Sequence, residues 1–446
     1  MSTVDDVLAY VDAAAERFVE EWRAACRIPS VRGGAVLEMA DWVVERARPL
    51  LDTVELVEAG EAPPSVVGTL AGEGRGRLLL YSHYDVQPAA LEDGWTVDPF
   101  EAVVRDGALV SRGCADDKAD VVGRLQALEA WRAVVGPLPV SVVWLCEGAE
   151  ESGSLGLPEV IEARRPLLES CDWALWESYL RREDGRPEIG FGCRGLLYVE
   201  LRLRRLEHDQ HSAFATIYRS APSELVKALA SLVHPDGTVA IDGFRDGAVV
   251  VPDPELLAEI EAPAERVGCG GTSGLLVGDP RELSRRLIYE PTANIAGIWT
   301  GWTGPGPKTV LPAEARARLD FRLVPGQTPE KALRLLRAHL DRRGFGDVEI
   351  EVLSASPPAS SPLDSRLAEA VTAAAAESFG PPVRHPWVAG SGPVHHVSGT
   401  LGIPIVMPPG ATRLTSRIHG PDENAAIDDY LDLVRFTVRL FARLGG

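Results

Sequence analysis

Hydrophobic residues recur at two kinds of spacing in the first 190 residues of the chain. Intervals of three and four residues, which are typical of amphipathic helices, occur over 3–28, 119–135 and 157–170. Short apolar runs, which are typical of strands buried on both faces, occur over 75–82, 138–146 and 172–176. Because such strands and helices alternate, this part of the chain predicts an α/β domain whose mostly parallel sheet is covered by helices.

The pattern changes near residue 190. Apolar and charged residues alternate over 196–204 and 315–323, which predicts half-exposed strands of an antiparallel sheet. Helical spacing occurs over 223–232 and 329–342. The block therefore predicts a smaller α+β domain that is inserted into the first domain.

The chain is expected to return to the first domain after residue 354. The Pro- and Ser-rich segment 354–362 is interpreted as a linker, and the glycine-rich segment 268–274 of the inserted block as a surface loop. Helices over 365–379 and 425–444 and a strand over 403–407 complete the first domain. The predicted domains are 1–190 with 355–446, and 191–354.

Composition and charge narrow the classes of function. The 446 residues include 65 Asp and Glu against 45 Lys and Arg, which gives a formal net charge of −20. This balance argues against nucleic acid or an anionic membrane as a partner, whereas carboxylates remain good ligands for cations. The six cysteines form no Cys-x-x-Cys pair, no apolar run could span a membrane, and the N-terminus lacks a basic signal region. We therefore expect a cytoplasmic protein with reduced thiols.

Acidic residues and histidines are concentrated in five short stretches. These are Ser82–Asp85, Gly113–Lys118, Glu147–Ser154, Glu177 and Ile418–Asn424. Each alone has an ordinary structural explanation, such as a buried histidine, a pair of acids that cap a helix, or a solvated acid. The first four, however, follow predicted strands, and α/β sheets bind ligands at the carboxyl ends of their strands. Two histidines and three carboxylates suit a pair of divalent ions with one bridging acid, and a further carboxylate could act as general base.

Seven motifs carry a resemblance to a known family. In chain order they are Ser82-His-Tyr-Asp-Val-Gln-Pro88, Gly113-Cys-Ala-Asp-Asp-Lys118, Glu147-Gly-Ala-Glu-Glu-Ser-Gly-Ser154, Asp209-Gln-His-Ser212, Lys308-Thr-Val-Leu-Pro312, Arg322-Leu-Val-Pro-Gly-Gln327 and His419-Gly-Pro-Asp-Glu423. In this order, and over essentially the whole chain, they resemble the dinuclear zinc peptidases and acylases of the M20 clan. That clan includes carnosinase-like dipeptidases, carboxypeptidase G2, aminoacylase-1 and succinyl-diaminopimelate desuccinylase. The Lys308 and Arg322 motifs are most similar to the dipeptidase branch.

The resemblance implies a metal centre with two divalent ions per subunit. Zinc is the expected metal, and manganese and cobalt are the alternatives, because all three accept this ligand set. The implied ligands are His83, Asp116, Glu151, Glu177 and His419. Asp116 would bridge both ions, and the peptide bond after it is expected to be cis. His83 and Glu177 would complete one site. Glu151 and His419 would complete the other.

The resemblance also implies roles in the reaction. Asp85 would orient His83, and Glu150 would take a proton from the metal-bridging water and pass it to the leaving nitrogen. The metal-bridged hydroxide that results would attack the substrate carbonyl. His211 would donate a hydrogen bond to the oxyanion from the lid domain of a partner subunit, so a homodimer is expected.

Substrate-binding residues are implied in the inserted block and beyond it. Arg322 would pair with the substrate carboxylate, because a guanidinium binds a carboxylate in bidentate fashion. Asn294 and the backbone N–H groups of Gly390, Ser391 and Gly392 would bind the polar backbone of the substrate. A surface salt bridge and a plain turn are the structural alternatives.

The leading interpretation is a metal-dependent hydrolase that cleaves the amide bond next to a free carboxylate in dipeptides or short peptides. An N-acyl-amino-acid amidohydrolase and a catalytically silent, peptide-binding family member are the alternatives. In this interpretation 1–190 with 355–446 is the catalytic metal-binding domain, and 191–354 is the lid and dimerisation domain. The segment 213–218 departs from the Gly-rich run that is usual in dipeptidases, so the substrate preference stays open.

Overall fold

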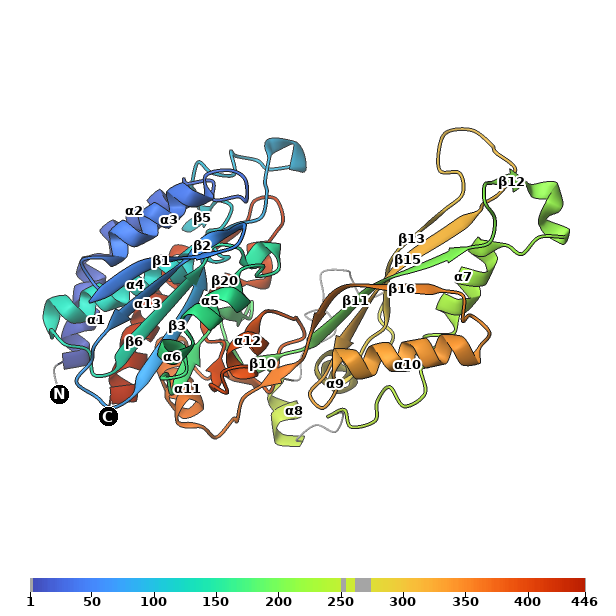
Figure 1. Ribbon diagram of the computed structural model, residues 1–446. Helices are drawn as coiled ribbons and strands as arrows, with labels where there is room; N and C mark the ends of the chain where they lie inside the picture. Colours follow the sequence, from blue (N-terminus) through green and yellow to red (C-terminus); the bar gives the residue numbers. More distant parts are fainter. Residues whose placement is uncertain (1–2, 250–253, 261–273, 446) are drawn as a thin grey trace. The chain divides into compact units, whose positions relative to one another are not determined.

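The computed structural model describes residues 3–249, 254–260 and 274–445, which form two compact units (Figure 1). Unit 1 comprises Met1–Gly192, Ser360–Pro386 and Pro393–Gly446, and unit 2 comprises Cys193–Ala359 and Trp387–Gly392. The surface loop predicted at 268–274 lies outside the described residues, apart from Gly274. The catalytic and lid roles of the predicted domains stay predictions.

Unit 1 is built on a six-stranded sheet in the order β1-β2-β6-β3-β7-β19. In that order the strands are Thr53–Ala59, Ala62–Leu70, Ser141–Glu147, Arg77–His83, Trp173–Leu175 and Ile405–Val406. The last four run parallel, whereas β1 and β2 form an antiparallel edge that the sequence pattern does not indicate. Strands β3 and β6 are apolar and buried almost throughout, as strands covered on both faces must be. The predicted α/β fold with a mostly parallel sheet is confirmed.

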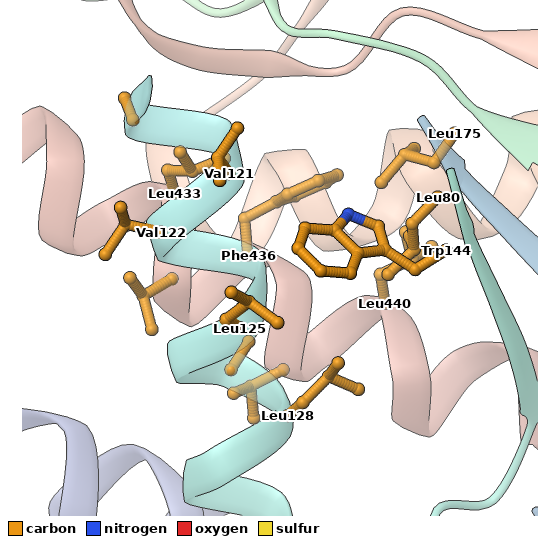
Figure 2. Close-up of a cluster of buried hydrophobic side chains, with 14 of the residues drawn as sticks. Leu80, Val121, Val122, Leu125, Leu128, Trp144, Leu175, Leu433, Phe436 and Leu440 are labelled. Carbon is orange, nitrogen blue, oxygen red and sulfur yellow. The ribbon is translucent and has the colours of Figure 1, made fainter. Parts of the chain in front are cut away.

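The core of unit 1 joins the central strands to two long helices, α4 (Lys118–Val134) and α13 (Ile427–Gly445). Figure 2 shows Leu80 of β3, Trp144 of β6 and Leu175 of β7 packed against both helices. The helix residues in this cluster are Val121, Val122, Leu125 and Leu128 of α4 and Leu433, Phe436 and Leu440 of α13. Such dense packing allows little movement, so the core holds the carboxyl ends of these strands in fixed positions.

Shorter elements complete unit 1, and two of the predicted helices are divided. Its other helices are α1 (Thr3–Ala13), α2 (Ala15–Cys26), α3 (Val36–Ala47), α5 (Leu157–Ala163), α6 (Arg165–Leu168), α11 (Arg366–Phe379) and α12 (Val394–Ser398). Its short strands are β4 (Val103–Arg105), β5 (Ala108–Val110), β8 (Tyr179–Arg181), β9 (Glu188–Gly190), β18 (Val383–His385), β20 (Pro409–Arg413) and β21 (Asn424–Ala426). The helix predicted over 3–28 is α1 and α2. The one predicted over 157–170 is α5 and α6, because Pro166 in the first turn begins a new helix.

Unit 2 contains an antiparallel sheet in the order β13-β15-β11-β16. In that order the strands are Asn294–Thr300, Glu314–Leu323, Gly195–Arg204 and Glu349–Ser356. Alternate residues of β11 and β15 are buried and share a core with α7 (Ala221–Ala230) and α10 (Pro329–Arg342), which confirms the predicted half-exposed strands. Strand β16 continues to Ser356, and β17 occupies Ala359–Ser360, so the interpretation of 354–362 as a linker is wrong for these residues.

Several short elements of unit 2 bear on the predicted site. Strand β12 (Gln210–His211) pairs with β14 (Val310–Leu311), and the 3-10 helix η3 (Ser212–Thr216) follows β12 directly. The other helices are α8 (Pro254–Ile260) and α9 (Pro280–Tyr289), and strands β10 (Gly192–Cys193) and β17 (Ala359–Ser360) contain residues at which the chain passes between the units. Within the described parts of both units, no helix is long and apolar enough to cross a membrane.

Candidate metal centre

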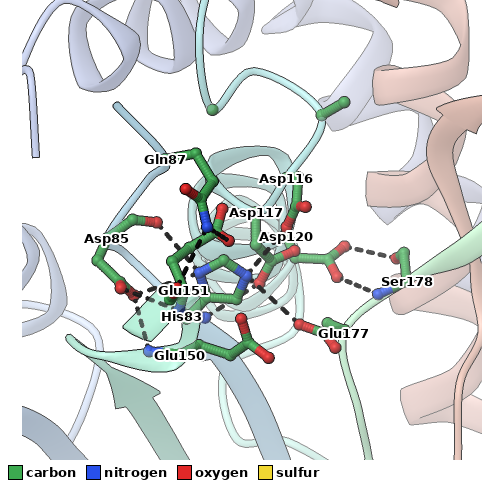
Figure 3. Close-up of polar contacts among 12 residues, drawn as sticks. His83, Asp85, Gln87, Asp116, Asp117, Asp120, Glu150, Glu151, Glu177 and Ser178 are labelled. Atoms are coloured by element: carbon green, nitrogen blue, oxygen red, sulfur yellow. Dashed lines mark hydrogen bonds and ion pairs between the residues drawn. The ribbon is translucent and has the colours of Figure 1, made fainter. Parts of the chain in front are cut away.

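Four of the five predicted metal ligands lie together at one end of the sheet of unit 1, namely His83, Asp116, Glu151 and Glu177 (Figure 3). The fifth, His419, contacts Asp116 and Glu151. His83 is the last residue of β3, and Glu177 follows β7 by two residues. Glu150 and Glu151 begin the short 3-10 helix η2 (Glu150–Ser152), which follows β6. Because β3, β6 and β7 are parallel, their carboxyl ends meet at the same edge, as the sequence pattern predicts.

The carboxylate of Asp116 faces two separate groups of side chains. Its Oδ1 lies 3.0 Å from Nε2 of His83, and its Oδ2 lies 3.2 Å from Nε2 of His419. On the first side, Oε2 of Glu177 lies 3.4 Å from Nε2 of His83. On the second side, Oε2 of Glu151 lies 3.0 Å from Nε2 of His419. One carboxylate is therefore shared between two groups, as a bridging ligand would be.

The donor atoms are suited to divalent cations. Ligand atoms of Asp116, Glu151 and His419 lie within 4.8 Å of one another, and so do those of His83, Asp117 and Glu177. Oε1 of Glu151 is buried and has no hydrogen-bond partner among the residues that the structure describes, although buried polar atoms normally have one. Carboxylates and imidazoles are ligands that zinc, manganese and cobalt accept. The residues present therefore fit a pair of divalent ions. Asp117 is a ligand candidate that the sequence analysis does not include.

Burial and crowding shift the pKa values of these groups. Burial, with the nearby charges of Asp116 and Glu151, raises the pKa of Glu150 to about 8. Burial and the charge of Glu150 raise the pKa of Glu177 well above its usual range. For His83, burial lowers the pKa, but hydrogen bonds to Asp116 and Asp85 outweigh it and raise the pKa well above its usual value. All three shifts show a site that favours added positive charge, whether protons or metal ions.

Asp85 contacts both the imidazole and the acidic turn. Its carbonyl oxygen lies 3.1 Å from Nδ1 of His83, and its Oδ1 lies 3.4 Å from the same nitrogen. The two carboxylate oxygens accept hydrogen bonds from the backbone N–H groups of Glu150 and Glu151, each at 3.1 Å. Nδ1 of His83 thus faces Asp85 while Nε2 faces Asp116, and the carboxylate of Asp85 holds the start of η2. This is the position from which it could orient His83, and that role stays a prediction.

Glu423 is a positioning residue that the sequence analysis contains only as part of a motif. Its buried carboxylate accepts hydrogen bonds from the backbone N–H groups of Gly113, Ala115 and Asp116 at 3.0–3.2 Å, and from Nη1 of Arg112 at 2.5 Å. It thus holds the loop that presents Asp116. The peptide bond between Asp116 and the following residue is cis, as the resemblance implies.

The predicted substrate-binding residues lie in unit 2. Nδ2 of Asn294 donates to Oδ2 of Asp320 at 2.7 Å, and Nε of Arg322 lies 3.7 Å from Oδ1 of the same carboxylate. Sequence analysis does not identify Asp320 or the buried Arg194. Burial, with the charge of Arg322, lowers the pKa of Arg194 to about 10. Strands β13 and β15 therefore place Asn294 and Arg322 beside the same carboxylate, and Arg194, which precedes β11, lies near enough to Arg322 for their charges to interact.

The segment Gly390–Gly392 contacts the first residues of unit 2. The carbonyl oxygen of Gly390 accepts from the backbone N–H of Arg194 at 2.9 Å, and the hydroxyl of Ser391 donates to the carbonyl oxygen of Gly195 at 3.2 Å. The carbonyl of Gly392 lies 3.8 Å from the Cys193 thiol. These bonds use carbonyl and hydroxyl groups, so the predicted use of the backbone N–H groups for substrate stays a prediction.

His211 also lies in unit 2, in strand β12, and its side chain is exposed. Its Nδ1 accepts a hydrogen bond of 3.1 Å from the backbone N–H of Ala213. A neutral imidazole that accepts through Nδ1 carries its proton on Nε2. The predicted oxyanion donor therefore has an N–H group available on its outer nitrogen.

For the metal-free protein we expect the melting temperature to fall as the pH rises from about 5 to about 8. Burial raises the pKa of Glu147 to about 7 and that of Glu150 to about 8. Hydrogen bonds to Asp116 and Glu151 raise the pKa of His419 to about 10. A group whose pKa is raised on folding stabilises the protein fully below its unfolded-state pKa, and this stability is lost as the pH rises through the folded-state pKa. Calorimetry in the presence of a chelator measures the effect.

The metal-loaded protein provides the control for this measurement. Metal ligands bind in their deprotonated forms, so the gain in melting temperature on adding Zn²⁺ should increase with pH over the same range. Groups elsewhere in the protein titrate equally in both samples, so their contributions cancel in the difference between the two melting temperatures. A metal-free melting temperature that stays constant or rises, with a metal effect independent of pH, would contradict the expectation.

Comparison with known proteins relates this arrangement to a family. Residues 79–443 match the model of peptidase family M20/M25/M40. The Cys-Gly metallodipeptidase dug1 of Schizosaccharomyces pombe is 31% identical over 366 residues, which are 76% of this chain and 76% of that protein. The Beta-Ala-His dipeptidase of Rattus norvegicus is 27% identical over 385 residues, which are 80% of this chain and 78% of that protein.

Solved structures with the same fold cover almost the whole chain. The M20 family metallo-carboxypeptidase Sso-CP2 from Sulfolobus solfataricus is 32% identical, with a TM-score of 0.89 over 96% of this chain and 99% of that one. The di-peptidase Dug1p from Saccharomyces cerevisiae superimposes with a TM-score of 0.84 over 100% of this chain and 99% of that one. Its identity is 24%, so this second likeness concerns the fold alone.

Proposed function

This chain belongs to peptidase family M20, and from that premise we propose that it is a metal-dependent dipeptidase. It hydrolyses the amide bond next to a free carboxylate in dipeptides or short peptides. The observation that carries the proposal is the position of Asp116, whose two carboxylate oxygens face His83 and His419 separately. Relatives named as dipeptidases and a similar structure named as a metallo-carboxypeptidase support this bond and this substrate class.

The proposed cofactor is a pair of divalent ions per subunit, with zinc as the expected metal. His83 and Glu177 would hold one ion, Glu151 and His419 would hold the other, and Asp116 would contact both. Bound ions of this kind polarise a carbonyl oxygen and make water nucleophilic near neutral pH.

Glu150 is the proposed general base. Its backbone N–H is fixed by Asp85, and Figure 3 shows it at the same end of the sheet as His83 and Glu177. In the metal-free protein burial raises its pKa to about 8, and two bound cations would lower that pKa toward the range in which a carboxylate accepts and returns a proton. Glu150 would take the proton from the attacking water and deliver it to the leaving nitrogen.

His211 is the proposed oxyanion donor, and it would act on the site of a partner subunit. Its bond from Ala213 leaves the proton on Nε2, which is the form that can donate to a developing negative charge. The proposal therefore includes a homodimer. It also includes a cytoplasmic location, which the scattered cysteines favour. Arg322, with Asn294 close by, would bind the free carboxylate of the substrate.

The function can be tested with a substrate panel on protein that is stripped of metal and then reloaded. We expect no activity without metal and hydrolysis of dipeptides after Zn²⁺ is restored. A dipeptide with an amidated C-terminus should be cleaved roughly 10- to 100-fold less efficiently in kcat/KM, because it loses charged hydrogen bonds to a guanidinium worth about 1.5–3 kcal/mol. Tripeptides and tetrapeptides in the same panel measure how far the activity extends to carboxypeptidase substrates.

Two outcomes of this panel would contradict the proposal. Hydrolysis of N-acetyl or N-succinyl amino acids alone would identify an N-acyl-amino-acid amidohydrolase. Metal binding without hydrolysis of any substrate would identify a silent, peptide-binding family member.

A further inference from the structure

Trp176 links the strand β7 to a proposed metal ligand. Its side chain is completely buried in unit 1, and it stands between Leu175, the last residue of β7, and Glu177. Its indole Nε1 donates a hydrogen bond of 3.1 Å to Oε1 of Glu177. The other oxygen of that carboxylate, Oε2, lies 3.4 Å from Nε2 of His83. The two oxygens of Glu177 therefore face different partners.

The indole ring is held by a stacked tyrosine. The rings of Tyr81 and Trp176 have centroids 3.5 Å apart and planes only 4° apart. The Tyr81 hydroxyl donates at 2.7 Å to Oε2 of Glu147, which also accepts from the Ser154 hydroxyl at 3.2 Å. Tyr81 is buried as well, so neither ring can turn without displacing its neighbours.

The backbone around both rings is fixed from helix α4. The guanidinium of Arg124 donates to the carbonyl oxygens of Tyr81 and Trp176, at the ends of two neighbouring strands. It also donates to Asp120 at 3.0 Å, and Asp120 in turn accepts from the backbone N–H and the hydroxyl of Ser178 at 2.5 and 2.6 Å. The indole N–H is therefore presented from a rigid support.

We propose that Trp176 is a positioning residue that fixes the carboxylate of Glu177 so that only Oε2 is presented to the metal ion on the His83 side. A free glutamate side chain has several rotamers, and ordering it on a metal ion costs conformational entropy. Because the indole N–H holds Oε1, the carboxylate is already ordered before a metal ion binds. The inference rests on the proposed metal site and adds a residue that orients the ligand Glu177. Side chains that hydrogen-bond to metal ligands commonly increase the affinity for the metal by orienting those ligands.

The test is the affinity of the Trp176→Phe protein for Zn²⁺, measured by competition with a chelating dye. Phenylalanine retains an aromatic ring for the stack with Tyr81 and removes the N–H group. We expect the dissociation constant to be roughly 10- to 100-fold larger for one of the two ions and unchanged for the other. Titration of the metal-free Trp176→Phe and Glu177→Asp proteins with Co²⁺, followed by visible absorption, shows whether both changes affect the same one of the two binding steps.

Trp131→Phe is the matched control. Trp131 is almost fully buried in the same unit, and its Nε1 donates at 3.1 Å to the carbonyl oxygen of Pro137, away from the metal ligands. The substitution removes an indole hydrogen bond of the same length. It should change the melting temperature and leave both metal affinities unchanged.

A double-mutant cycle measures whether the effects of two substitutions on Zn²⁺ affinity are coupled, which a purely structural role of Trp176 does not predict. Glu177→Asp shortens the side chain and withdraws the carboxylate from the indole N–H. In the Glu177→Asp protein, Trp176→Phe should therefore cost much less affinity than in the wild type, because the two changes remove the same interaction. Additive losses would mean that Trp176 acts by another route.

Other outcomes separate this inference from the proposed function. Wild-type affinity for both ions in Trp176→Phe, or equal weakening of both ions, would overturn the role of Trp176 and leave the metal site intact. Failure of the wild type to bind Zn²⁺ would overturn the metal site itself. If Trp176→Phe does not fold, the benzothienyl analogue of tryptophan at position 176, which keeps the shape and lacks the N–H, should show the same loss.

Discussion

Replacement of Glu150 by glutamine should lower kcat by roughly 100- to 10,000-fold, which is the usual contribution of a general acid–base group. Glutamine has nearly the same shape but cannot accept a proton. The backbone bond from Glu150 to Asp85 does not depend on the side chain, so η2 should keep its conformation. Steady-state kinetics with a dipeptide, together with metal analysis of the same sample, measure the effect.

The neighbouring residues provide the controls for Glu150→Gln. Glu151→Gln should instead reduce the metal content, because Oε2 of Glu151 faces His419 as a proposed ligand. Glu162→Gln alters an exposed glutamate of α5 and should change neither quantity.

In the wild type, kcat/KM should fall at acid pH as Glu150 becomes protonated, and this acid limb should be absent from Glu150→Gln. Full turnover by Glu150→Gln with two bound ions would remove Glu150 from the mechanism.

His211→Ala should lower kcat by roughly 100- to 1,000-fold, as the loss of one oxyanion donor does in other hydrolases. Metal content should not change, because His211 lies in unit 2 and the proposed ligands lie in unit 1. His208→Ala removes an exposed histidine from the same segment and should have no effect. An equal loss in both variants would indicate damage to the segment and not the loss of a donor.

Mixing two inactive variants tests whether His211 acts across subunits. In a heterodimer of His211→Ala with Glu150→Gln, one site combines an intact Glu150 with an intact His211 from the other subunit. Random exchange in a symmetric dimer then restores about a quarter of the wild-type activity, since half of the dimers are mixed and each has one complete site. No recovery, despite proven subunit exchange, would exclude sharing of the site between subunits.

The sequence indicates the central sheet and most of the site because both depend on local patterns. Strand β3 is a continuous apolar run that ends in His83, and β6 ends in the same way ahead of Glu150 and Glu151. A buried parallel strand must be apolar, and its carboxyl end is where polar ligand-binding residues can reach solvent. The position of these groups at one edge therefore follows from the order of elements along the chain.

The parts that the sequence does not indicate depend on contacts between distant segments. Glu423 supports Asp116 from more than 300 residues away, and no local pattern shows that pairing. Trp176 has the apolar character of any strand residue, and its role depends on the orientation of its N–H toward Glu177. The antiparallel edge of the sheet is missed because β1 and β2 show neither a continuous apolar run nor regular alternation.

The support of the Asp116 loop by Glu423 has a consequence for how the protein is made. Both Glu423 and His419 follow the loop that they complete by roughly 300 residues of chain. A chain still on the ribosome can form β3 and β6 but lacks the anchor of the loop and half of the second ligand group. On the proposed function, the nascent polypeptide cannot hydrolyse its substrate until Glu423 and His419 have been synthesised.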